Sequence, residues 1–216
     1  MKMQKQVDRS HYNFGAYMEK RRWISVWHQL NEVIAQRPKT VLEIGPGPGI
    51  FKSTATAFGL NVKTLDIDPD LKPDYIASAT EIPIADYSVD VVCAFQVLEH
   101  LPFETSMVAL KEMYRISRKA ILISLPDVKT SWASTLTIPK LGTFHVVLPR
   151  PRFKPKPHQF DGQHYWEISK REYSLKRVTS EIQKSTPNCT IRTYRVHENQ
   201  YHRFFIIEKP KDLDQT

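Results

Sequence analysis

The fold is decided by residues 40–49, which read Thr-Val-Leu-Glu-Ile-Gly-Pro-Gly-Pro-Gly. Residues 40–44 are a short apolar run, which predicts a buried strand. A glycine-rich turn follows, and residues 50–58 have a helical pattern that Gly59 ends. Glycines let the backbone turn sharply and bring a ligand close to the bare amides of the next helix. This order therefore indicates a ligand site, with a plain strand–helix connection as the alternative.

Short apolar runs alternate with helical patterns along most of the chain. This alternation predicts an α/β fold, a doubly wound and mostly parallel sheet with helices on both faces. The expected strands cover residues 40–44, 61–66, 75–77, 90–95, 120–125, 189–196 and 203–208, and the expected helices cover residues 18–36, 50–58, a stretch after Pro102 and a stretch around 175–182. Six residues separate the last two strands, so we expect them to form an antiparallel hairpin.

The first 37 residues precede this pattern and are expected to form a helical lid or cap. In the helix over 18–36, Trp23, Trp27, Leu30 and Ile34 step by four, three and four, which gives an amphipathic helix one apolar stripe. An aromatic segment, residues 11–17, comes before the helix. This segment either covers a ligand pocket or packs against the core.

Length and composition indicate one globular domain over residues 1–216. The chain has 216 residues, 41% of them hydrophobic, which excludes a disordered chain. Its apolar runs are far shorter than the ~20 residues that a transmembrane helix needs, and the N-terminus lacks the apolar core of a secretory signal. Two cysteines, Cys93 and Cys189, have neither disulfide nor metal spacing. We therefore expect a soluble, cytoplasmic protein of undetermined oligomeric state.

The net charge of +8 is concentrated in one insertion, residues 126–166, and the segment after it. Residues 140–177 hold nine Lys and Arg against three acids, and five of the 15 prolines lie between Pro139 and Pro157. Proline fixes φ and removes a donor, so residues 149–157 are expected to be extended. The insertion is too long for an ordinary connection. It is either a solvated loop or an arm that attracts an anionic substrate, RNA or a membrane surface.

Asp66 is a second ligand candidate, because it ends the second expected strand, 17 residues beyond Gly49. In a doubly wound sheet this position faces the same crevice as the glycine turn, where a carboxylate can accept both ribose hydroxyls. A dinucleotide dehydrogenase would need glycine at position 50, and the chain has Ile50 there.

Several motifs resemble class I S-adenosylmethionine-dependent methyltransferases, in particular the small-molecule "type 11" branch. They are residues 43–49, Asp66, and then residues 77–83, 90–101 and 115–125 in the family's order. The resemblance implies the sheet order 3-2-1-4-5-7-6, with strand seven antiparallel. It also implies S-adenosylmethionine as the cofactor, with S-adenosylhomocysteine as the product. The cofactor contacts that it implies are Glu43, Gly45, Gly47, Gly49, Asp66, Ile67, Ser78, Ala79 and Gln96.

The resemblance also implies a role for several of these contacts. It implies that Glu43 helps to orient the amino acid end of the cofactor and that the glycine turn lies against its methionine part. It also implies that Asp66 holds the ribose and that Ile67 packs on the adenine. Two positions depart from the pattern. Ser78 stands where relatives often carry an Asp for the adenine amine, and residues 115–119 lack the usual double glycine.

Residues after the fourth strand restrict the chemistry. They read Phe95-Gln96-Val97-Leu98-Glu99-His100, without the Asn/Asp-Pro-Pro-aromatic run of enzymes that methylate base amines. Cys93 lies inside the strand, which makes it a core residue rather than a nucleophile. The stretch also resembles the Glu-x-x-Glu-His metal site of small-RNA 2′-O-methyltransferases, but Gln96 replaces the first Glu and weakens a hard-cation site. We therefore expect no metal, and we assign His100 to the substrate pocket.

His164 is the candidate catalytic base, because it lies near the end of the insertion and histidine titrates near neutrality. Tyr165 and Trp166 are candidates to wall the acceptor, and Arg150 and Arg152 to bind an anionic group. Trp166 could instead anchor the insertion, with His164 only a hydrogen-bonding group.

Three functions follow from the sequence. The first is methyl transfer to O or N, and less readily C, of a small molecule, glycan or lipid precursor. The second is an RNA methyltransferase that uses the same cations. The third is a non-catalytic module that keeps the fold.

Overall fold

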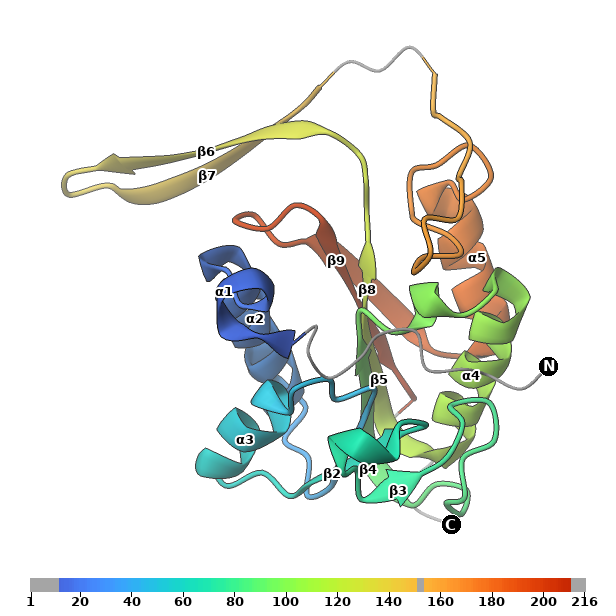
Figure 1. The fold of residues 1–216 in the computed structure, drawn as a ribbon. Coiled ribbons are helices and arrows are strands. Elements are labelled where there is room, and N and C mark those ends of the chain that lie inside the picture. Colours follow the sequence, from blue (N-terminus) through green and yellow to red (C-terminus); the bar gives the residue numbers. More distant parts are fainter. Residues whose placement is uncertain (1–11, 151–153, 211–216) are drawn as a thin grey trace.

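The computed structural model describes residues 12–150 and 154–210. Its centre is a seven-stranded sheet in the order β3-β2-β1-β4-β5-β9-β8 (Figure 1). Neighbours from β3 to β5 pair in parallel, whereas β9 pairs antiparallel with β5 and β8. The predicted strand order, antiparallel seventh strand and terminal hairpin are therefore confirmed. The strands are β1 (Val41–Ile44), β2 (Val62–Asp66), β3 (Tyr75–Ile76), β4 (Val89–Phe95), β5 (Ser117–Pro126), β8 (Thr190–Arg195) and β9 (His202–Glu208).

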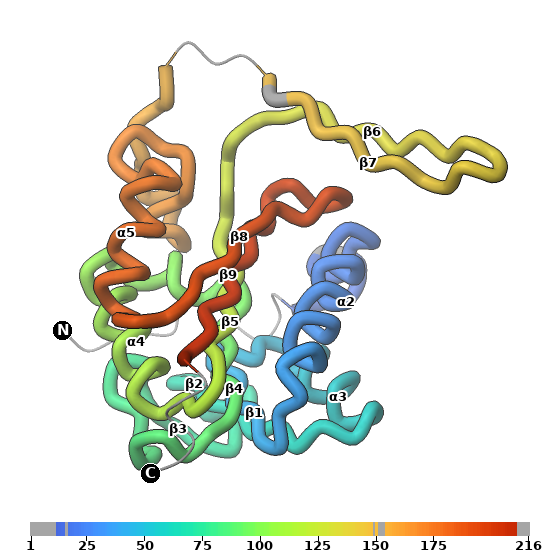
Figure 2. The backbone as a smooth tube through the Cα atoms, turned by 180° about the vertical axis from the view of Figure 1, so that it is seen from behind, coloured from blue at the N-terminus to red at the C-terminus, as the bar shows by residue number. Residues whose placement is uncertain are grey.

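Helices cover both faces of this sheet, with α2 and α3 on one side and α4 and α5 on the other (Figures 1 and 2). Successive strand residues point to opposite faces, so Val91 belongs to the core under α2 and α3, and Val92 to the core under α4 and α5. A strand buried on both faces is mostly apolar, as the central strands are apart from polar residues such as Glu43 of β1. The helices are α2 (Lys20–Ala35), α3 (Ile50–Ala57), α4 (Phe103–Ile116) and α5 (Leu175–Ser185).

The helix predicted over residues 18–36 is confirmed as α2, but the apolar stripe expected on it is exposed except at Leu30. Trp23, Trp27 and Ile34 are 44%, 59% and 44% exposed, whereas Val26 and Val33 are buried with Leu30. The two apolar stripes share Leu30 but are otherwise offset by one residue, about 100° around the helix. The sheet therefore packs against the stripe with the smaller side chains, Val26, Leu30 and Val33, and both tryptophans stay exposed.

The insertion contains a second, two-stranded sheet that the sequence analysis does not predict. β6 (Ser131–Ile138) and β7 (Gly142–Pro149) pair antiparallel along their whole length. The hairpin projects from the body of the molecule (Figures 1 and 2). Residues 149–157 are expected to be extended, and of these Pro149 ends β7 while residues 154–157 form neither helix nor strand.

The insertion begins and ends at one place on the sheet. Asp127 forms a parallel bridge with Ile168, and its carboxylate accepts a hydrogen bond from Ser169 Oγ at 2.7 Å. The same carboxylate accepts one from Arg203 Nε of β9 at 2.8 Å. These contacts fix residues 161–168 beside the edge of the sheet where the parallel strands end.

At the other end of the chain, a one-turn helix, α1 (Phe14–Tyr17), precedes α2. None of the helices in the described ranges is both apolar enough and long enough to cross a bilayer.

Candidate active site

The glycine turn is held in a backbone conformation that only glycine adopts without strain. Gly45 and Gly47 have φ values of +66° and +52°. A Cβ on Gly45 would lie 2.6 Å from a methyl carbon of Val97, so no larger residue fits there. Gly49 has a φ of +77° and caps the N-terminus of α3. The turn is therefore a tight backbone cradle at the end of β1, as the sequence predicts.

Asp66 lies beside this turn, because the register pairs Ile44 of β1 with Leu65 of β2. Its Oδ1 accepts a hydrogen bond from the Asp68 amide at 2.8 Å, which fixes the carboxylate at the strand end. Burial raises the pKa of Asp66 above its usual value, with hydrogen bonds from the amides of residues 68 and 67 opposing the shift. Ile67, the expected adenine contact, is 36% exposed.

Glu43 is a buried carboxyl group in β1 beneath the turn. Burial raises its pKa from 4.5 to about 8, and the charge and amide of Lys52 oppose that shift. Its Oε2 has no hydrogen-bond partner among the described residues. A buried polar atom without a partner is costly, so this oxygen is suited to a donor on a bound ligand, such as an ammonium group.

The N-terminal residues in the described range lie over the same crevice. The Tyr12 ring would be 3.3 Å from a Cβ on Gly47, and it makes an edge contact with Tyr17 at a centroid distance of 5.0 Å. Burial raises the pKa of Tyr12 to about 12, and the nearby carboxylates of Asp66 and Asp68 add to the shift. Tyr12 also lines a cavity of about 290 Å³ on the outer side of the turn, a cavity that does not include Asp66. This position suits the expected lid; residues 1–11 lie outside the described range.

Three further expected cofactor contacts are at the ends of neighbouring strands. The Ser78 hydroxyl forms its hydrogen bonds within its own turn. It lies 2.7 Å from the Thr80 hydroxyl and accepts a hydrogen bond from the Thr80 amide at 3.0 Å. Ala79 next to it is buried. Gln96 turns the chain after β4 with a φ of +58°, and its side chain is tied to Ser124 Oγ of β5 at 3.3 Å.

The structure brings His164 and His100 together, with ring centroids 5.0 Å apart. His164 Nδ1 lies 3.4 Å from Glu167 Oε1 and 3.3 Å from the Tyr201 hydroxyl, which itself donates to Glu167 Oε1 at 2.7 Å. Burial lowers the pKa of His164, but the Glu167 hydrogen bond and nearby carboxylates outweigh it and raise the pKa. The hydrogen bond with His164 in turn lowers the pKa of Glu167 to about 2.

Glu99 lies under the two histidines. Its side chain is fully buried, neither carboxylate oxygen has a hydrogen-bond partner among the described residues, and burial raises its pKa to about 8. Glu99, His100 and His164 each offer a ligand atom, and these atoms lie within 4.8 Å of one another. Such a group can exchange a proton with an acceptor or hold a divalent cation.

The other expected acceptor residues, Tyr165 and Trp166, follow His164 in the chain. Trp166 is fully buried, its indole N–H donates to Ser106 Oγ at 3.1 Å, and it packs on Phe103. The expectation that Trp166 walls the acceptor is therefore corrected, because its ring anchors the insertion in the core. Tyr165 packs on Phe160, with ring centroids 4.6 Å apart.

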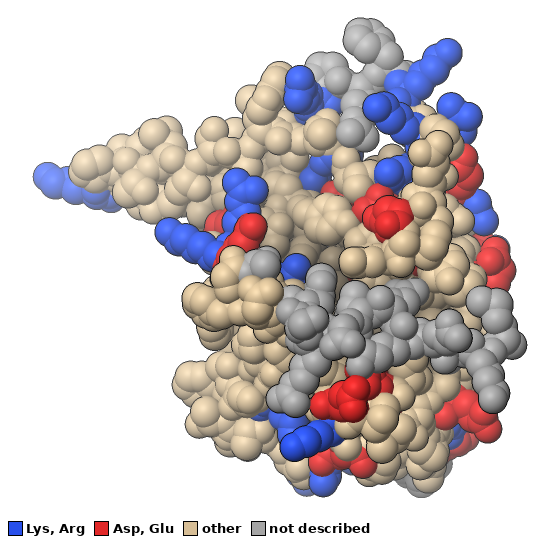
Figure 3. Space-filling view, viewed as in Figure 1, with Lys and Arg blue, Asp and Glu red and all other residues tan. Residues whose placement is uncertain are grey.

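Of the two arginines expected to bind an anion, Arg150 is exposed at the base of the hairpin, and Arg152 lies outside the described residues. In Figure 3, Lys and Arg side chains gather along the upper edge of the molecule and at the tip of the hairpin. No contact joins Arg150 to the histidine pair in the described part of the chain, so its place in the substrate site stays a prediction.

Glu167 and Tyr201, which orient His164, are absent from the sequence-based site. Glu167 stands three residues after His164, and this spacing could have suggested it. Tyr201 is 37 residues away and no local pattern indicates it.

Known proteins resemble this chain in sequence and fold. Residues 42–123 match the family model described as "Methyltransferase domain". An uncharacterized methyltransferase of Mycobacteroides abscessus is 30% identical over 135 residues, 56% of this chain and 50% of the relative, so the chain spans about half the length of the curated relatives it matches.

Two solved structures share the fold at low identity. The 1,6-didemethyltoxoflavin-N1-methyltransferase of Burkholderia thailandensis aligns with a TM-score of 0.60 at 13% identity, over 94% of this chain and 85% of that one. The small RNA methyltransferase HEN1 aligns with a TM-score of 0.60 at 14% identity, over 87% of this chain and 25% of that one.

Proposed function

Since residues 42–123 form a methyltransferase domain on a class I sheet, we propose that this protein transfers the methyl group of S-adenosylmethionine to an oxygen or nitrogen atom of a small molecule, a glycan or a lipid precursor. One observation carries the proposal. A buried carboxylate oxygen of Glu43 without a partner among the described residues and the Asp66 carboxylate lie at the ends of adjacent strands, beside a glycine cradle.

We expect the cofactor to lie along these strand ends. Glu43 is suited to its ammonium group, Asp66 to its ribose hydroxyls, and the half-exposed Ile67 to one face of the adenine. Ser78, Ala79 and the backbone of Gln96 complete the expected contacts. The toxoflavin-type neighbour was crystallised with bound S-adenosylhomocysteine, which supports the same class of cofactor here.

The acceptor side would supply a base. The sulfonium of the cofactor provides an electrophilic methyl group, so the protein chiefly holds the acceptor in line and removes its proton. Glu167 faces His164 Nδ1, which would leave Nε2 to take that proton, while the methyl carbon would exchange its bond to the sulfonium sulfur for a bond to the acceptor. Glu167 and Tyr201 act as positioning residues, because they fix the ring through Nδ1.

The test is a screen of metabolites and RNA for methyl transfer from a labelled cofactor. We expect label in a small acceptor and release of S-adenosylhomocysteine. A protein that binds the cofactor but labels no acceptor would be the non-catalytic module instead.

Two reduced, buried cysteines agree with the cytoplasmic location that we propose.

An RNA methyltransferase is the second candidate, and the group Glu99, His100 and His164 favours it, since a metal at that place would hold an RNA hydroxyl. One of the fold neighbours is a small RNA methyltransferase. RNA affinity should then fall steeply with salt, and replacing Arg150, Arg152, Lys154 and Lys156 should reduce that slope. If chelators leave turnover unchanged and RNA does not bind at low salt, this candidate is excluded.

A further inference from the structure

The hairpin of β6 and β7 has two unlike faces. Cross-strand partners share a face, so the register that pairs Trp132 with Leu148 and Leu136 with Phe144 separates the side chains into two sets. The first set, here called the outer face, is Trp132, Ser134, Leu136, Ile138, Phe144, Val146 and Leu148. The second set, the inner face, is Ser131, Ala133, Thr135, Thr137, Thr143, His145 and Val147. The outer face is apolar except for one serine.

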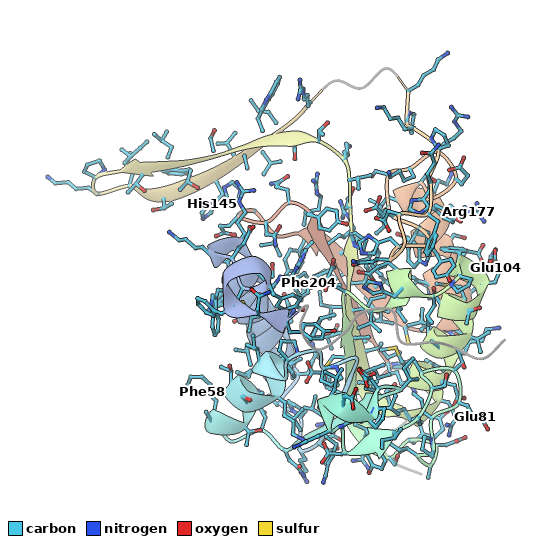
Figure 4. All side chains as sticks on the ribbon, viewed as in Figure 1. Phe58, Glu81, Glu104, His145, Arg177 and Phe204 are labelled. Atoms are coloured by element: carbon cyan, nitrogen blue, oxygen red, sulfur yellow. The ribbon has the colours of Figure 1, made fainter. Side chains whose placement is uncertain are left out.

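The inner face is the one that contacts the body of the protein. Thr135 Oγ1 lies 3.1 Å from His197 Nε2 in the turn between β8 and β9, and the rings of His145 and His197 are 4.5 Å apart. Ser131 Oγ also bonds to Gln200 in that turn. Figure 4 shows His145 on the side of the hairpin that faces α1 and α2. The outer face therefore points away from the molecule.

The outer face is uncovered by the described residues. Leu136 and Phe144 are 56% and 46% exposed, and Trp132, Val146 and Leu148 are between 43% and 56% exposed. A contiguous apolar face of this kind marks an interaction site, because soluble proteins seldom leave one bare.

Positive charge surrounds this face at both ends. Lys140 lies in the turn at the tip, and Lys129 and Arg150 lie at the base, all exposed. Residues 128–160 contain no Asp or Glu, while Lys129, Lys140, Arg150, Arg152, Lys154 and Lys156 fall within them. The partner must therefore offer an apolar layer beside negative charge.

We propose that the outer face of the hairpin docks on a lipid bilayer with anionic headgroups. The apolar side chains enter the boundary between headgroups and acyl chains, and the cations at the tip and base bind lipid phosphates. A second copy of the chain fits poorly, since a two-fold pairing of this face would bring equal cations together with no acid in the segment to neutralise them. The proposal is independent of methyl transfer.

Co-sedimentation of the full chain with vesicles tests this docking. We expect binding to phosphatidylcholine vesicles that contain phosphatidylglycerol, and at least about tenfold weaker binding to phosphatidylcholine alone. Replacing the cross-strand pair, Leu136→Thr with Phe144→Thr, should weaken binding at least about tenfold. The matched control is Phe58→Thr, since Phe58 is 72% exposed at the end of α3, away from the hairpin.

Titration with S-adenosylhomocysteine monitors the fold of each variant and keeps this result separate from the proposed activity. The proposal would be overturned if the wild-type protein does not bind anionic vesicles. It would also be overturned if the double variant, Leu136→Thr with Phe144→Thr, binds them as well as the wild type. Dimerisation in solution that this double variant abolishes would assign the face to a second copy instead.

Discussion

At the scale of single residues, Asp66 is the group on which cofactor affinity should depend most. One of its oxygens already holds the Asp68 amide, and the strand end places the carboxylate beside the glycine cradle. Asp66→Ala should weaken binding of S-adenosylhomocysteine by about ten- to a hundredfold, since hydrogen bonds to a charged group contribute about 1.5–3 kcal/mol. Calorimetric titration measures the change.

Asp66→Asn separates the two roles of this side chain. An amide oxygen can keep the bond to the Asp68 amide, but it carries no charge for the ribose. We expect an intermediate loss of affinity with unchanged stability. The matched surface control is Glu104→Ala on α4, and equal affinity in the wild type and Asp66→Ala would contradict the ribose assignment.

The pH profile of turnover should depend on the pair of His164 and Glu167. A base works in its neutral form, so kcat/KM should rise with pH through the raised pKa of His164, above 6.5. Glu167→Gln replaces the charged acceptor of this hydrogen bond with a neutral amide, which should lower the pKa of His164. The acid limb should therefore move to lower pH, and the maximum should fall about tenfold or more. Glu172→Gln, an exposed acid nearby, is the control. If the acid limb of Glu167→Gln stays at the same pH as in the wild type, His164 is not the catalytic base.

Glu99 should make the stability of the unliganded protein depend on pH. Its pKa is about 8 in the folded protein against 4.5 for the free group, so the folded state holds an extra proton between these values. The free energy of unfolding should therefore fall as pH rises through this window, with the full stability present below about pH 4.5. Denaturant titrations at about pH 6 and about pH 8 should differ by more than about 1 kcal/mol.

Glu99→Gln should flatten this dependence, and Glu104→Gln, at an exposed position, should not. Glu43, with the same raised pKa, leaves a residual slope in Glu99→Gln. If the free energy of unfolding falls with pH as steeply in Glu99→Gln as in the wild type, Glu99 is ionised and paired in the folded protein.

At the scale of elements, the insertion depends on one anchor. Trp166 is fully buried against α4, whereas Trp132 on the hairpin is 55% exposed. Trp166→Ala should lower the free energy of unfolding by about 3–5 kcal/mol. Trp132→Ala should change it by less than about 0.5 kcal/mol. Urea unfolding compares the two, and equal costs would contradict the anchoring role.

The sequence predicts elements well where one periodic pattern is present and poorly where two compete. The central strands are mostly apolar runs, so their places follow from the pattern, and their order follows from the family resemblance. In α2 the stripe of Trp23 and Trp27 and the stripe of Val26 and Val33 have similar spacing, and only the shape of the sheet decides between them. The hairpin escapes prediction because its outer face has no partner in the described part of the chain that would reveal it.

At the scale of the molecule, the arrangement of residues around the glycine turn could be predicted, and the arrangement around His164 only in part. Glu43, the glycine turn and Asp66 are fixed by local motifs and by the strand order. His164 follows from its place in the chain, but Tyr201 and the burial of Glu99 depend on contacts between distant segments. Local sequence carries no record of such contacts.

The central claim is that the crevice between the glycine turn and Asp66 binds the methyl donor. Calorimetric titration of the whole chain with S-adenosylhomocysteine tests it most directly. We expect one molecule to bind per chain at micromolar concentration, with affinity reduced about ten- to a hundredfold in Asp66→Ala and unchanged in Glu104→Ala. Absence of heat and of thermal stabilisation at millimolar ligand would contradict the claim.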